Sequence, residues 1–400
     1  MDQRRFLVVL VAGLALAAAC NSEPAEISRA REVLASSIAA DPGYHEYALT
    51  VTKGSNAAHA KALRLDAMVQ GSRTVAGEAI HAVGDSPDAE TLAALSQAFA
   101  GSGSVKLAAA AVLARNGNTE AVEWLAGQLR QTGYLLSTPA MVALAENGHE
   151  EAVRNSLGVL VANDDVTIRN EGYEMLGAIG ETWATGMLLN GLEREFGEER
   201  AGPIVALGKT GDASVALKIR DWVGIQGLVL ASLEALGNLG DAEAMQQVGP
   251  MLAHEQPLVR LYAAIAAAKL GAMDQASEAV STLLTDESPD IRMELAVQLA
   301  GIEDAAATGW LMDLTGDTEK TVRAEAFRAL IGRDAAGLGE AFARGAQDTE
   351  YEVATVALTG LAEAGDASQV AGVAPLLDSE NPYLAIGAAH VVLSLAGDQG

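Results

Sequence analysis

Residues 241–271 have the sequence DAEAMQQVGPMLAHEQPLVRLYAAIAAAKLG, and the pattern in this stretch is the one from which the fold is predicted. In each half of it, apolar residues recur every three or four positions, which is the spacing of one helix face and not the alternation of a strand. The stretch therefore predicts two short helices, about 242–252 and 258–270. Pro257 suits the first turn of the second helix. Pro250 should kink or shorten the first helix.

The same pattern recurs along the chain, and every copy ends at a marker position that is usually glycine. The markers, spaced 29 to 33 residues apart, are Gly84, Gly117, Gly148, Gly180, Gly211, Gly240, Gly271, Glu303, Arg333, Gly365 and Gly397. Glycine tolerates the left-handed conformation that ends a helix. Asp or Asn follows the marker in eight of the eleven copies and can cap the next helix. The chain is therefore a repeat array.

A pair of short helices cannot bury both of its own apolar faces, but stacked neighbouring pairs can share one continuous core. Hydrophobic residues make up 50% of the chain and aromatic residues only 4%, so this core must be built from small aliphatic side chains. The fold class predicted is all-α. It is an α-α superhelix, or solenoid, of about eleven two-helix repeats with a period near 31 residues, and no strand is expected.

Several breaks between the paired helices carry an Asp, five further residues and then an Arg. Two breaks have the full motif: Asp286 with Arg292, and Asp317 with Arg323. Two others keep only the arginine, Arg169 or Arg260, and two keep only the acid, Asp348 or Asp378. This motif resembles HEAT repeats, especially the short type of the phycobilisome lyases. The resemblance covers about residues 55–400 and implies a HEAT/armadillo-like fold. It also implies that these Asp and Arg residues hydrogen-bond along the stack and hold adjacent repeats in register. The alternative is a charged binding track.

The N-terminal residues have the features of an export signal. Arg4 and Arg5 precede a short apolar run and then small residues before Cys20, the only cysteine. A positive start, a short apolar stretch and a small-residue cleavage site make a secretory signal. With the cysteine directly after it, the segment resembles a bacterial lipoprotein signal, which implies acylation of Cys20. In the lipoprotein family an Asp after the cysteine retains some members in the inner membrane, so Asn21 implies the outer membrane, and we predict its periplasmic face. The alternative is an ordinary secretory signal with an incidental cysteine.

Four segments follow from these observations. They are a lipoprotein signal peptide at 1–19, a tether at 20–26, an N-terminal helical cap at 27–54 with one helix over about 27–39, and the HEAT-repeat solenoid at 55–400.

The charge balance restricts the partners. The chain has 26 Lys and Arg against 53 Asp and Glu, a net charge of -27. Nucleic acid is excluded as a partner, because binding to phosphates depends on positive charge. A protein partner with a basic or neutral surface is favoured. A lone cysteine rules out an internal disulfide framework and a zinc site built from several cysteines.

Some helical-repeat proteins are enzymes. Deoxyhypusine hydroxylase resembles this architecture and binds iron through His-Glu pairs early in its second helices. Here the corresponding glutamates are Glu171, Glu294 and Glu325, and no histidine precedes any of them. We therefore predict no catalytic residue, no cofactor and no metal site.

The last predicted helix, residues 383–396, is apolar almost all round. Solenoids usually end in a polar capping repeat. Ile386 and Val392 are therefore predicted to form a docking end for a partner or a second copy of the chain. The alternative is a tolerated, frayed end.

Together these features predict a non-enzymatic, lipid-anchored periplasmic scaffold that binds another protein through its repeat surface. Two alternatives stay open: an enzyme-maturation factor or lyase-like HEAT protein, and an envelope structural protein that self-associates through its C-terminal repeat.

Overall fold

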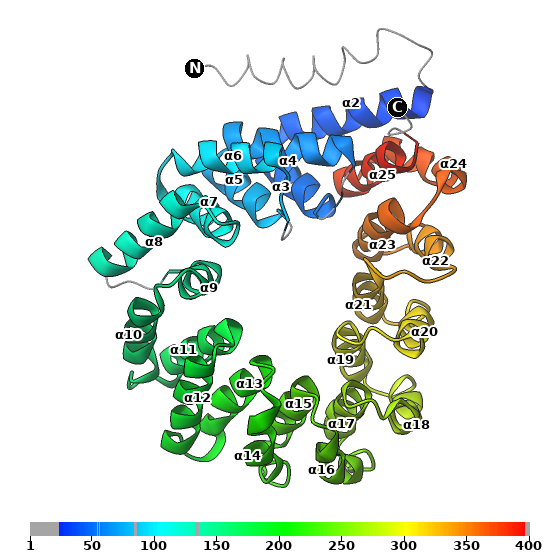
Figure 1. Ribbon diagram of the computed structural model, residues 1–400. Helices are drawn as coiled ribbons and strands as arrows, with labels where there is room; N and C mark the ends of the chain where they lie inside the picture. Colours follow the sequence, from blue (N-terminus) through cyan, green and yellow to red (C-terminus); the bar gives the residue numbers. More distant parts are fainter. Residues whose placement is uncertain (1–23, 54, 56, 84–85, 133–135, 397–400) are drawn as a thin grey trace. The chain divides into compact units, whose positions relative to one another are not determined.

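A computed structural model of the chain describes residues 24–396 except 54, 56, 84–85 and 133–135 (Figure 1). Within these ranges every regular element is a helix and none is a strand. The helices follow one another in pairs, so the predicted all-α, HEAT/armadillo-like solenoid is confirmed. The predicted signal peptide at 1–19, Cys20, Gly84 and Gly397 lie outside the described residues.

The helices belong to two compact units, which we describe separately. The first unit consists of the described residues up to Ala109 and from Glu303 onward, and the second is Ala110–Ile302. Helices of the first unit are α2 (Ala25–Ala40), α3 (Pro42–Val51), α4 (Ala58–Gln70), α5 (Arg73–His81), α6 (Ala89–Phe99), α20 (Ala305–Leu314), α21 (Lys320–Leu330), α22 (Leu338–Gly345), α23 (Tyr351–Ala364), η5 (Ala367–Gln369), α24 (Val370–Val373), η6 (Ala374–Asp378) and α25 (Pro382–Leu395).

The second unit continues the same pairing of helices. Its helices are α8 (Thr119–Thr132), α9 (Thr138–Glu146), α10 (Glu150–Val161), α11 (Val166–Ile179), α12 (Thr182–Arg194), η2 (Gly197–Arg200), α13 (Ala201–Lys209), η3 (Ala213–Val215), α14 (Ala216–Arg220), α15 (Val229–Leu239), η4 (Ala242–Ala244), α16 (Met245–Met251), α17 (Pro257–Lys269), α18 (Met273–Leu283) and α19 (Pro289–Leu299). The chain passes from the first unit to the second within α7 (Gly103–Arg115).

The stretch that decided the fold forms the elements expected of it. Pro257 opens α17 in its first turn, and Pro250 lies inside the short helix α16. The core of this repeat is aliphatic, because α17 buries mostly alanines with Val259, Leu261 and Ile265.

Most marker glycines end helices as predicted. They have φ between +68° and +86° at Gly117, Gly148, Gly180, Gly211, Gly240 and Gly271. Side chains at the following position accept a backbone N–H at Asn118, Asp212, Asp241, Asp304 and Asp366. One marker was misplaced: the left-handed residue of that repeat is Gly332 and not Arg333. Gly365 does end α23, but in an extended conformation with φ of −85° and not a left-handed one.

The predicted N-terminal cap has two helices where one was expected. Asp41 does end α2, but its carboxylate also accepts the Gly43 N–H at 2.7 Å and starts α3. Pro42 is the first residue of α3, where proline is pre-organised for a helix. The break therefore joins two helices.

This pair of helices covers the last helix of the array, within the first unit. Helix α2 lies along α25, and α3 also contacts it (Figure 1, blue and red). Ile386 and Val392 are both 0% exposed. The docking end predicted at these two residues is therefore not open to a partner: the chain's own N-terminal helices occupy it. An apolar terminal helix needs a cover, and here α2 and α3 supply it.

Polar and aromatic contacts accompany this junction. Arg29 of α2 donates to one carboxylate oxygen of Asp378 from Nη2 at 2.7 Å and from Nε at 3.0 Å. The ring of Tyr47 meets that of Tyr383 edge-on, with centroids 4.9 Å apart. His59 of α4 and His390 of α25 share a hydrogen bond of 2.8 Å between Nε2 and Nδ1.

We expect the junction to weaken in acid. Burial, His59 and Arg64 together lower the pKa of His390 to about 3 from an ordinary value of 6.5. In the unfolded chain His390 takes up a proton near its ordinary pKa, whereas in the folded chain it stays neutral. Its contribution to stability is thus complete above pH 6.5 and is lost as the pH falls toward 3, by about 1.4 kcal/mol per pH unit.

Unfolding titrations between pH 7 and pH 5 measure this slope. His390→Gln should flatten it, while the same change at the exposed His81 should leave it unaltered. Equal slopes for wild type and His390→Gln would contradict the assignment.

The search for membrane spans gives no candidate: none of the helices in the described ranges combines the length and hydropathy of a bilayer-crossing segment.

Candidate functional site

The predicted Asp-Arg motif forms a ladder between adjacent repeats. Each arginine is the fourth residue of its second helix, and its guanidinium donates to backbone carbonyls in the break before that helix. Arg323 Nη1 donates to the carbonyl of Asp317 at 2.9 Å, while Nε and Nη2 donate to Asp348 of the next repeat at 2.7 and 3.0 Å. The geometry is that of a contact between repeats.

Other members of the ladder repeat this pattern. Arg292 Nη1 donates to the carbonyl of Asp286 at 2.7 Å, and Arg260 Nη2 lies 4.0 Å from the Asp286 carboxylate. The Asp286 and Asp317 carboxylates accept backbone N–H groups two residues later, which shapes the break before each helix. The acid of the motif therefore makes up to three contacts. Its carbonyl accepts from the arginine of its own repeat, its carboxylate shapes the turn, and at Asp286 and Asp348 the carboxylate also faces the arginine of the preceding repeat.

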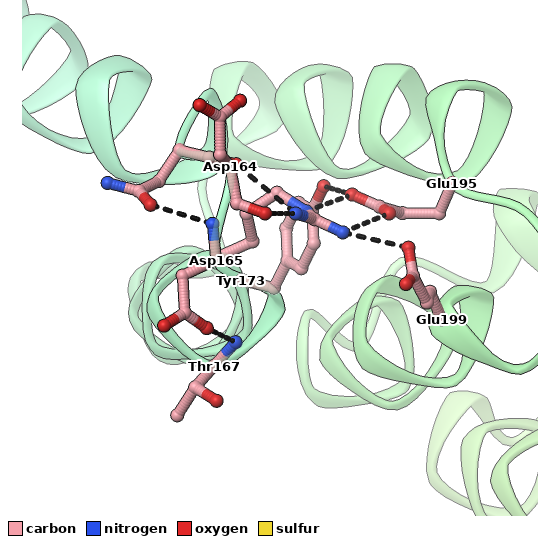
Figure 2. Close-up of polar contacts among 8 residues, drawn as sticks. Asp164, Asp165, Thr167, Tyr173, Glu195 and Glu199 are labelled. Carbon is pink, nitrogen blue, oxygen red and sulfur yellow. Dashed lines mark hydrogen bonds and ion pairs between the residues drawn. The ribbon is translucent and has the colours of Figure 1, made fainter.

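The Arg169 rung is the most buried, and it lies in the second unit (Figure 2). Arg169 donates to both carboxylate oxygens of Glu195, at 2.7 and 2.8 Å, and to Glu199 at 2.8 Å. The Tyr173 hydroxyl donates to Glu195 at 2.7 Å. Burial raises the pKa of Glu195, but the hydrogen bonds from Arg169 and Tyr173 outweigh it, so its pKa lies below the usual value. Burial and the bond to Glu195 raise the pKa of Tyr173.

This rung fixes the loop that joins α12 to α13. Glu195 opens the loop and Glu199 lies near its end, and both carboxylates bind the same guanidinium. Between them, Phe196 is 76% exposed. A large aromatic side chain is thus presented to solvent on a loop whose two ends are tied to the core.

A second loop, between α14 and α15, lies against the first. Arg200 is stacked between the rings of Phe196 and Trp222, with its Cζ 5.8 Å and 4.6 Å from their centroids. Gly227 has φ of +84° and approaches Glu198 so closely that an added Cβ would lie 2.6 Å from the Glu198 Cγ. Ile225 in the same loop is 47% exposed.

We call these four residues the aromatic loop patch: Phe196, Arg200, Trp222 and Ile225. The patch lies where the ladder is interrupted, because the fourth residues of α13 and α15 are Ile204 and Ser232 in place of arginine. Aromatic and arginine side chains are the residue types that dominate binding energy in protein interfaces. The described residues contain no group of three His, Cys, Asp or Glu side chains that could hold a metal ion.

The sequence alone did not indicate this patch. Trp124 and Trp310 each stand seven residues after a repeat marker, whereas Trp222 stands at a different position. Phe196 stands in an acidic break with no apolar periodicity around it. The available signal was irregularity: six residues before the fourth helical residue, where the ladder motif has Asp, the breaks at 195–200 and 221–228 have Glu198 and Gln226, and neither break contains a proline.

No family model matches the chain, and no curated protein matches it. Solved structures similar to it include the phycocyanin lyase complex of CpcE and CpcF from Nostoc sp. PCC7120. That match has 19% identity and a TM-score of 0.41, and it covers 60% of this chain and 93% of the other. Importin beta matches at 12% identity and a TM-score of 0.37, covering 97% and 66%. Human deoxyhypusine hydroxylase matches at 18% identity and a TM-score of 0.28, covering 68% and 95%. At these values the similarities do not extend to function.

Proposed function

We propose that the protein is a non-enzymatic scaffold, anchored by a lipid on Cys20 at the periplasmic face of the outer membrane, that binds another protein through the aromatic loop patch. The observation that supports this most is the exposure of Phe196 on a loop held by the buried Arg169 rung.

Two physical reasons favour a protein partner at this patch. An exposed aromatic side chain gains much apolar burial when a partner covers it. A loop that is already ordered loses little conformational entropy on binding, so more of that gain appears as affinity. Because the Phe196 ring faces solvent, a partner must bring its own complementary surface to cover it.

Truncation of Phe196 should release the partner. We expect Phe196→Ala to lower the yield of in-cell crosslinking from a photoreactive residue at Gln226 by about tenfold, the effect of losing one interface hot spot. Val159→Ala is the matched control, since Val159 is 72% exposed in the same unit and lies outside the patch. Equal yields from the two variants would contradict the proposal.

Loss of the anchor should release the protein from the envelope. Cys20→Ser removes the acylation site, so we expect the protein to move from the membrane fraction to the soluble periplasmic fraction. Metabolic labelling with a radioactive fatty acid should mark the wild type and not the variant. Membrane association of an unlabelled Cys20→Ser protein would refute the lipid anchor and leave binding at the patch to be judged separately.

A further inference from the structure

We infer that the aromatic loop patch recognises a basic peptide segment of its partner, one that carries a large apolar side chain between lysines or arginines. This inference rests on the proposed function and adds the chemistry of the partner.

The centre of the patch is apolar. Phe196 is 76% exposed and Ile225 47% exposed, and Ile225 lies in the same loop as the half-buried Trp222. The one cation at the centre, Arg200, is already engaged: its guanidinium stacks on both rings and its Nε donates to the Leu192 carbonyl at 3.2 Å. The centre therefore offers apolar contact to an incoming side chain.

The rim of the patch is acidic. Glu198 packs against Gly227 and is two residues from both Phe196 and Arg200, and Asp221 directly precedes Trp222. Both carboxylates are exposed, and the structure joins neither of them to a cation by a hydrogen bond or ion pair. Carboxylates at an interface rim attract basic groups and repel acidic ones.

The charge of the surrounding unit acts in the same direction. Residues 110–302 hold 12 Lys and Arg against 26 Asp and Glu, a net charge of -14. A field of this sign speeds the approach of a basic segment and slows that of an acidic one. Since the two loops of the patch come from successive repeats, an extended peptide laid across them contacts both.

The test is a titration of the full chain with three labelled synthetic octapeptides, followed by fluorescence polarisation. The first has a Phe-Leu pair between lysines, the second has glutamates in place of the lysines, and the third keeps the lysines and has serines in place of Phe and Leu. We expect binding of the first alone. Phe196→Ala should weaken it about tenfold, and Val159→Ala should not change it.

A second variant tests the rim. Glu198→Gln combined with Asp221→Asn should weaken the first peptide severalfold and reduce the dependence of its affinity on salt, because rim charges act mainly through long-range attraction. Phe196 and the rim residues are exposed, so these variants leave the fold intact, which circular dichroism checks.

Three results would overturn the inference: equal binding of the acidic peptide, equal binding of the serine peptide, or no binding of the first peptide up to about 1 mM. These outcomes are separable from failure of the proposed function. If crosslinking from Gln226 depends on Phe196 but captures an acidic or uncharged segment, the scaffold function stands and the basic-peptide inference is wrong.

Discussion

Ile386→Glu should destabilise the first unit by about 4 kcal/mol or more. Ile386 is 0% exposed in α25, the helix that α2 and α3 contact. The variant loses the burial of a large aliphatic side chain, which by itself costs about 2–5 kcal/mol, and it also places a carboxylate at a fully buried position. Urea unfolding would measure this loss of stability. A loss this large is typical of a core residue, so it would show that the contact between α25 and the N-terminal helices is part of the folded core.

Hydrogen exchange locates the effect. If α25 is covered by α2 and α3, amides in all three helices should lose protection together in Ile386→Glu. Val159→Glu, at an exposed position of the second unit, should leave both stability and exchange near the wild-type values. A normal unfolding curve for Ile386→Glu, combined with a change in the size of a complex, would instead restore these residues as a docking end for a partner.

Glu195→Ala should cost about 3–5 kcal/mol in the second unit, because it leaves the guanidinium of Arg169 buried and without its main carboxylate partner (Figure 2). Breaking a buried pair is expensive since the remaining charge cannot return to water. Glu199→Ala is the matched control within the same cluster. Glu199 also binds Arg169, but its side chain is 51% exposed, so its removal should cost well under half as much.

The double variant distinguishes the stability that the ion pair contributes from the cost of leaving one buried charge unpaired. Replacing Arg169 and Glu195 together with leucines should recover most of the stability lost in Glu195→Ala, because no unpaired charge then stays in the core. If the double variant is less stable than Glu195→Ala, the pair itself supplies the stability and this explanation fails.

The same rung has a pH dependence of its own. Because the pKa of Glu195 is lowered in the folded chain, its contribution to stability is present above its ordinary pKa and is lost as the pH falls through the folded value. The loss from Glu195 begins near its ordinary pKa of 4.5, whereas the loss from His390 begins near pH 6.5, so between these two values only the His390 contribution changes.

Loosening this rung should also affect binding at a distance. Glu195 and Arg169 lie outside the aromatic loop patch, yet they hold both ends of the loop that presents Phe196. A Glu195→Ala protein that still folds at low temperature should therefore bind the basic peptide more weakly than the wild type, through the ordering cost of a freed loop.

The repeat architecture can be predicted from local sequence signals alone. Helical spacing of apolar residues, glycine at helix ends and Asp or Asn at helix starts are all local signals, and each acts within a few residues of where it stands. That is why the residues of α17 and the caps at Asp212 and Asp304 were predicted correctly. The Asp-Arg spacing marked the ladder residues as well, since the arginine and its own break are close along the chain.

Two features depend on contacts between separate repeats and cannot be predicted from local signals: the cover of the last helix and the position of the exposed aromatic surface. Arg29 and Asp378 are 349 positions apart, and no periodicity in either segment specifies that they meet. Phe196 and Trp222 both meet the guanidinium of Arg200 because two successive repeats place their loops side by side. The hydrophobic effect is not directional, so an apolar face does not specify which other face covers it. The sequence shows that α25 must be covered, and only the packing of the folded chain shows that α2 and α3 cover it.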